Sequence, residues 1–183
     1  LMAASGLSRT GLISAETDAV PHEVASRFGE MLRKRQTRQP LQHILGSTEF
    51  YGLEFLCDGR ALIPRPDSEV VVEAALRRIP EGEAMIVADL GTGTGCLLAA
   101  ILANRPRVRG VGVEASPQAA SLARENLTRL KLQDRSTVFE GSWADWRDWQ
   151  TADLVISNPP YIASSEIAGL APEVRAHDPV SAL

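Results

Sequence analysis

Cysteine and histidine are scarce in this sequence. Only two cysteines occur among 183 residues, and Cys57 and Cys96 lie far apart in apolar surroundings, which predicts two buried thiols instead of a disulfide. The three histidines are scattered, and no group of side chains has the spacing of metal ligands. These absences indicate a cytoplasmic protein that needs no resident metal.

A strong net charge and a long apolar run are absent as well. The formal net charge is -4, which is not typical of a nucleic-acid-binding protein. A local basic segment at 33–38 is readily explained as a solvated helix end. No apolar run is long enough to cross a bilayer, and we expect neither a signal peptide nor a membrane partner.

The first 66 residues predict a helical segment and then a hairpin. Residues 1–16 are small and polar, so we expect a frayed start, whereas 21–35 has apolar residues at helical spacing. The β-prone runs 48–56 and 61–63 flank Asp58-Gly59, a strong turn dipeptide, which predicts a β-hairpin. We assign residues 1–46 to an N-terminal helical segment and 47–66 to a β-hairpin linker.

Strands and helices alternate in the remaining residues, 67–183. A helical pattern at 72–79 stops at Pro80, and short apolar runs at 85–88, 108–113, 136–139 and 153–157 predict four strands. Helices are expected at 96–103 and from Ser116-Pro117, a favourable N-cap and first-turn pair. This alternation favours an α/β fold with a parallel sheet covered on both faces.

A glycine-rich loop follows the first of these strands. Gly91, Gly93 and Gly95 allow a tight turn and let a ligand lie against bare backbone at a helix N-terminus. Glu114 ends the next strand, 19 residues after Gly95, where a carboxylate can accept hydrogen bonds from a ribose diol. We expect Asp89 to cap the loop and to lie near the ligand's amino-acid end. An adenosine-type ligand is predicted, and a tight turn beside a surface glutamate is the alternative.

The tetrapeptide Asn158-Pro159-Pro160-Tyr161 directly follows the fourth strand. The prolines have no N–H, so their carbonyls stay free to accept hydrogen bonds, the asparagine adds an oxygen, and the tyrosine adds a flat ring. This set suits a planar NH2 group on an sp2 carbon, aimed at a methyl group in line with its leaving sulfur. A strong general base is unnecessary, because the methylated nitrogen becomes acidic. A rigid strand-exit turn is the alternative interpretation.

Together these motifs resemble the class I methyltransferase pattern with an Asn-Pro-Pro-Tyr active site. More narrowly, the chain is similar to the release factor glutamine methyltransferases from about Gln39 to its last residue. This narrower resemblance rests on segments 39–46, 49–50, 63–69 (Ile-Pro-Arg-Pro-Asp-Ser-Glu), 173–174, 178–179 and 182–183.

The resemblance implies an enzyme with a Rossmann-like sheet. Its cofactor would be S-adenosyl-L-methionine (SAM), and its partner a peptide-chain release factor that is N-methylated on the glutamine amide of a Gly-Gly-Gln loop. The catalytic residues would be Asn158, Pro159 and Tyr161. The substrate contacts would be these three with Pro160 and Phe50, which would close over the amide. The cofactor residues would be Asp89, Gly91, Thr92, Gly93, Thr94, Gly95, Glu114, Trp143, which would lie near the adenine, and Asn158.

The sequence also departs from this family. Ser142 stands where an acid is usual, and Glu114 replaces a common Asp. The family has a longer helical N-terminal region, of which 1–46 would be the part that recognises substrate, and further strands beyond the methyltransferase segment 67–183. We therefore expect a C-terminally truncated sheet with strand order 3-2-1-4, an apolar fourth strand at its edge, and little turnover by this chain alone.

Other functions are compatible with parts of this pattern. An adenine-N6 nucleic-acid methyltransferase presents the same planar NH2 group after base flipping, but it would need a basic groove. A SAM-binding fragment without catalytic activity and a paralogue acting on a ribosomal-protein glutamine are the remaining alternatives.

Overall fold

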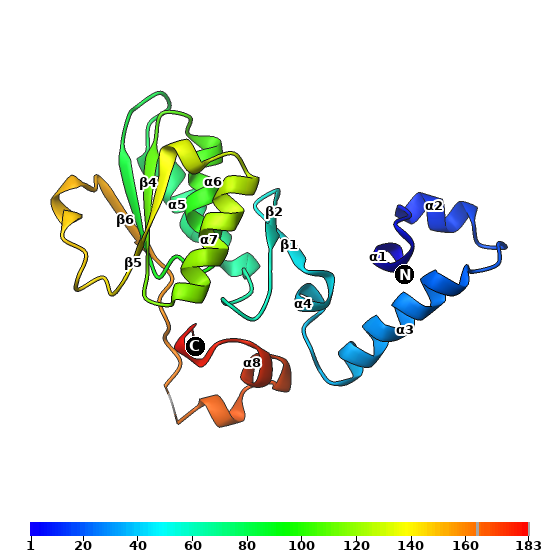
Figure 1. Cartoon of the computed structure of the whole chain (residues 1–183). Coiled ribbons are helices and arrows are strands. Elements are labelled where there is room, and N and C mark those ends of the chain that lie inside the picture. Colours follow the sequence, from blue (N-terminus) through cyan, green and yellow to red (C-terminus); the bar gives the residue numbers. More distant parts are fainter. Residues whose placement is uncertain (164, 183) are drawn as a thin grey trace.

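A four-stranded parallel sheet forms the centre of the computed structural model, which describes residues 1–163 and 165–182 (Figure 1). Its strands are β3 (Ile86–Leu90), β4 (Arg109–Glu114), β5 (Ser136–Glu140) and β6 (Leu154–Ser157), in the order β5-β4-β3-β6. The α/β class, the parallel pairing and the strand order are thereby confirmed. Leu183, which ends the expected match, lies outside the described residues.

Three helices cover one face of this sheet (Figure 1), namely α5 (Glu69–Arg78), α6 (Cys96–Asn104) and α7 (Pro117–Arg129). Residues 96–102 of α6 are all buried, in one apolar cluster with Val87 of β3. The opposite face is covered in part by the β5–β6 connection, whose Trp146 packs with Ala88 and Val113. That connection contains only the 3-10 helix η3 (Asp148–Thr151), and Val155 of β6, which pairs with Ala88 on this face, is 42% exposed.

The hairpin forms earlier in the chain than the sequence predicted. Strand β1 (Ser47–Phe50) pairs with β2 (Leu53–Leu56) across Tyr51 and Gly52, whose φ angles are both positive, at 50° and 73°. Such angles match the twist of a two-residue hairpin turn. A turn does form at Asp58-Gly59, where the Asp58 carboxylate accepts hydrogen bonds from the backbone N–H and the guanidinium of Arg60. The hairpin predicted across it was wrong, because residues 61–63 form no strand.

The N-terminal segment is helical from its start. It contains α1 (Met2–Ser5), α2 (Arg9–Ser14), α3 (His22–Gln36) and α4 (Leu41–Leu45). The expectation of a frayed start was wrong: the Ser8 side chain accepts a hydrogen bond from the backbone N–H of Gly11 and so caps α2. Helices α1–α3 lie apart from the sheet, and α4 and the hairpin join them to it (Figure 1).

After β6 the chain returns toward the sheet through η4 (Ile167–Gly169), α8 (Pro172–His177) and η5 (Val180–Ala182), as Figure 1 shows. Glu173 of α8 forms ion pairs with Arg35 in the last turn of α3 and with Arg38 just after that helix. The remaining short helices are η1 (Pro66–Ser68) and η2 (Gln133–Arg135). Within the described part of the chain, no helix is both long and apolar enough to cross a membrane.

Replacing Gly52 by alanine should lower the free energy of unfolding by about 1 kcal/mol, because an L-residue is strained at positive φ. A Cβ at Gly52 would meet no atom within 4 Å, so the loss would report the backbone alone. Urea denaturation would measure it. Gly169, which has equally open surroundings without a positive φ, is the matched control, and equal losses for both alanine variants would contradict the turn assignment.

Candidate functional site

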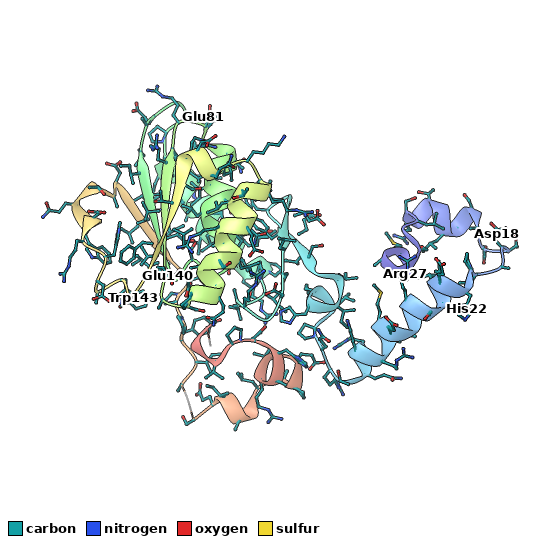
Figure 2. The ribbon with its side chains drawn as sticks, viewed as in Figure 1. Asp18, His22, Arg27, Glu81, Glu140 and Trp143 are labelled. Atoms are coloured by element: carbon teal, nitrogen blue, oxygen red, sulfur yellow. The ribbon has the colours of Figure 1, made fainter. Side chains whose placement is uncertain are left out.

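A cavity of about 280 Å³ lies at the carboxyl ends of the parallel strands. Figure 2 labels Glu140 and Trp143 at this end of the sheet and Glu81 at the opposite end. The cavity is bounded by the loop after β3, the end of β4, the loop after β5, the residues after β6 and segment 60–68. Its lining residues include Ile63, Arg65, Ser68, Gly91, Thr92, Gly93, Thr94, Glu114, Ser142, Trp143, Asn158, Pro160 and Pro179.

The glycine loop presents bare backbone to this cavity. Gly91 and Gly93 have φ angles of 69° and 56°, which glycine adopts at no steric cost. A Cβ built on Gly91 would have no atom within 4 Å, so the loop faces open space. The backbone N–H of Gly91 donates to the Val113 carbonyl at 2.8 Å, which fixes the loop against β4.

The Glu114 carboxylate is held at the cavity wall by backbone donors. Its Oε2 accepts from the Gly93 N–H at 2.9 Å and its Oε1 from the Ser116 N–H at 3.0 Å. Each oxygen keeps further lone pairs, because a carboxylate offers about four acceptor sites. Glu114 can therefore stabilise the loop and accept hydrogen bonds from a ligand at the same time.

Asp89 lies beneath the loop and is not part of the cavity wall. It is fully buried, and its Oδ2 accepts from the Thr92 hydroxyl at 2.6 Å. Burial raises the pKa of Asp89 to about 6, against the opposing effect of that hydrogen bond. Gly95 is buried against Ala123 of α7, so it too supports the loop from behind.

Two residues of the Asn-Pro-Pro-Tyr segment reach the cavity. Asn158 and Pro160 line it, and the Asn158 Nδ2 donates to the Ser68 hydroxyl at 3.1 Å. Pro159 is exposed and lies outside the wall, and the Tyr161 ring is 83% exposed. The structure therefore brings together the asparagine and one proline, with the tyrosine ring directed to solvent.

Trp143 and Phe50, the two outlying aromatic candidates, have different positions. Trp143 lies on the cavity rim beside Ser142 and is 43% exposed. Phe50 is 2% exposed and packs edge-on against Phe55, with ring centroids 6.3 Å apart, inside the main core. The structure does not bring Phe50 to the cavity, because the turn at Tyr51-Gly52 directs its side chain into the helical layer.

Sequence reasoning assigned no role to several residues that shape the site. The Arg65 guanidinium donates to the buried Asp178 carboxylate at 2.9 Å, and burial raises the pKa of Asp178. This ion pair holds residues 178–182 against the cavity, which Pro179 also lines. Asn126, fully buried on α7, exchanges hydrogen bonds with the Leu56 backbone and donates to the Thr94 carbonyl. In the sequence, an asparagine among the apolar residues of one helix face could have predicted that Asn126 is buried and hydrogen-bonded to another segment.

The comparisons with known proteins agree with this geometry. Residues 69–173 match the methyltransferase small domain, and residues 1–46 match the PrmC N-terminal domain. The chain belongs to the methyltransferase small-domain family, and its fold is that of the class I SAM-dependent methyltransferases, as predicted.

Its relatives include named enzymes. Over the whole of this chain it is 44% identical to the release factor glutamine methyltransferase of Geobacter sulfurreducens and 38% identical to that of Caulobacter vibrioides. The chain spans 63% of the length of each. The solved structure of P. horikoshii TYW2 in complex with MeSAdo has a TM-score of 0.51 at 18% identity, with 67% of this chain and 45% of that chain covered, so this likeness concerns the fold alone.

The Asp89→Asn variant should gain stability relative to the parent chain as the pH rises from about 4 to about 7. A folded-state pKa above the unfolded value means that the folded state binds more protons in this window, so the parent loses stability as the pH rises through it. Burial raises the pKa of Asp89 to about 6, so the difference should grow by about 2–3 kcal/mol at most.

Thermal unfolding of both proteins across this pH range would measure the effect. Asp145→Asn changes an exposed carboxylate in the loop after β5 and is the matched control. A difference between the Asp89→Asn variant and the parent that stays constant with pH would contradict the assignment.

Proposed function

We propose that this chain carries the methyl-transfer site of a cytoplasmic, SAM-dependent enzyme that N-methylates the glutamine amide in the Gly-Gly-Gln loop of a peptide-chain release factor. The observation that carries the proposal is the meeting of two motifs in one cavity: the glycine loop with Glu114 on one wall, and Asn158 with Pro160 on another. The named relatives support the choice of substrate.

The residues present fit SAM. The open space in front of Gly91 accommodates a ligand against bare backbone, and the cavity of about 280 Å³ is close to the lower end of the range for small-molecule sites, about 300 Å³. Bound SAM supplies a methyl group on a positively charged sulfur. Residues 91–94 would hold its amino-acid end and Asp89 would support them, Glu114 would accept hydrogen bonds from the ribose hydroxyls, and Trp143 would flank the adenine.

The second wall is suited to a carboxamide. An amide nitrogen is a poor nucleophile because its lone pair is delocalised, so orientation is the main contribution that a protein can make. The Asn158 oxygen and a carbonyl of Pro159 or Pro160 would accept hydrogen bonds from the two N–H groups of the substrate amide. These bonds would direct the amide nitrogen toward the methyl carbon. Tyr161, whose ring is exposed, would cover the amide plane when a protein substrate docks.

Replacing Glu114 by glutamine should weaken SAM binding about tenfold, because a hydrogen bond to a charged group contributes about 1.5 kcal/mol or more. Calorimetric titration of the chain with SAM would measure this. Glu140 is the matched control, since it ends the neighbouring strand opposite Glu114 and pairs with Arg124. Equal weakening by Glu140→Gln would contradict a specific role for Glu114.

Methyl transfer would be measured with a protein that has the full length of these relatives, since this chain spans 63% of that length. The protein would be incubated with labelled SAM and a purified release factor, and the labelled residue mapped by mass spectrometry. We expect label on the glutamine of the Gly-Gly-Gln loop and a loss of about 100-fold or more with Asn158→Ala, the usual scale for removing a group that stabilises the transition state. Label on DNA or on a ribosomal protein instead would refute the proposed substrate.

A further inference from the structure

Asn158 directly follows strand β6 of the described sheet. In the part of the chain that the structure describes, β6 pairs with β3 alone, and that pairing ends at Ser157 opposite Leu90. Among the described residues, 158–162 form no hydrogen bond with another part of the backbone. Within the described residues, the Asn158 carboxamide is oriented by one side-chain hydrogen bond.

That contact comes from Ser68. The Asn158 Nδ2 donates to the Ser68 Oγ at 3.1 Å, across 90 positions in the sequence. Ser68 is 8% exposed and lines the same cavity, so water competes little for this bond. The preceding residue is also held, because the Ser157 hydroxyl donates to the Leu90 carbonyl at 2.8 Å.

Ser68 is itself rigidly placed. Its backbone N–H donates to the Arg65 carbonyl at 3.0 Å within a 3-10 turn that leads directly into α5. On one side of it, Arg65 pairs with the buried Asp178. On the other side, the Glu69 carboxylate accepts from the Tyr51 backbone N–H at 3.0 Å. The residues on both sides of Ser68 are thus held to separate parts of the molecule, so the position of the Ser68 hydroxyl in the cavity wall is well defined.

A carboxamide has one acceptor and one donor end, and only the acceptor end can receive an N–H of a substrate amide. A serine hydroxyl can accept or donate, and in this structure the Ser68 hydroxyl accepts from the Asn158 NH2 group, which leaves the Asn158 oxygen free for the cavity. A carboxamide turned the other way would present N–H groups to N–H groups, which repel. We propose that Ser68 is the positioning residue that holds Asn158 in the productive orientation, an inference that rests on the proposed function of the site.

Kinetics of the full-length protein with SAM and a release factor would test this role. Ser68→Ala should lower kcat about tenfold, the cost of a net hydrogen bond of about 1.4 kcal/mol, with KM for the release factor and Kd for SAM within about twofold of the parent. Ser68→Cys, which keeps the side-chain shape but accepts hydrogen bonds weakly, should fall similarly. Ser68→Thr keeps the hydroxyl and should restore kcat.

Ser121→Ala is the matched control, since it removes a hydroxyl whose bond to Glu125 lies on the exposed side of α7. An unchanged kcat in both Ser68→Ala and Ser68→Cys would overturn the proposal. A rise in KM for the release factor at constant kcat would also overturn it, because Ser68 would then contact the substrate instead of Asn158.

A readout without turnover separates this inference from the proposed function. In ¹⁵N-labelled chain, the side-chain NH2 signals of Asn158 can be assigned by their loss in Asn158→Ala. They should show slow solvent exchange in the parent and in Ser68→Thr, and fast exchange in Ser68→Ala and Ser68→Cys. Equal exchange in all four proteins would refute the tie. Protected signals in a protein that never methylates a release factor would refute the proposed function and leave the tie standing.

Discussion

The parallel pairing of β3 with β4 and β6 is the constraint on which the site depends. In a parallel sheet all carboxyl ends lie at one edge, and the register aligns Leu90 with Val113 on one side and with Ser157 on the other. The residues just beyond these positions are the glycine loop, Glu114 and Asn158. Three segments separated by tens of residues thus enter one cavity because their strands are hydrogen-bonded neighbours.

The sheet by itself leaves two sides of the cavity open, and polar contacts from other elements close them. Segment 60–68 forms one wall. Arg65, Ser68 and the adjacent Glu69 hold it to three different parts of the chain. Asn126 joins α7 to the hairpin and to the glycine loop. Ser68, Asn126 and Asp178, the partner of Arg65, are buried, where a hydrogen bond is stronger than in water and an unpaired polar group is costly. Such contacts favour one arrangement of the walls.

Periodic patterns with strong local signals allowed much of the fold to be predicted. Short apolar runs between glycine and proline breaks identified the four strands, and Ser116-Pro117 identified the start of α7. The position of the hairpin turn was not predicted, because Tyr51 adopts a positive φ, which an aromatic residue seldom does. Asp58-Gly59, in contrast, has the usual composition of a turn. This dipeptide does form a turn, but no strand directly follows it, so the hairpin forms at Tyr51-Gly52 instead.

By itself the sequence determined the chemistry available at the site, because glycines, consecutive prolines, a carboxylate and a carboxamide limit what backbone and side chains can accept or donate. The strand order could also be predicted, through the resemblance. Only the tertiary structure decided which of these groups share a cavity: Asn158 and Pro160 line it, Tyr161 faces solvent, and Phe50 is part of the core. The physical reason is that side-chain orientation and burial depend on contacts between residues far apart in the chain, such as Ser68 with Asn158. Such contacts produce no pattern among neighbouring residues of the sequence.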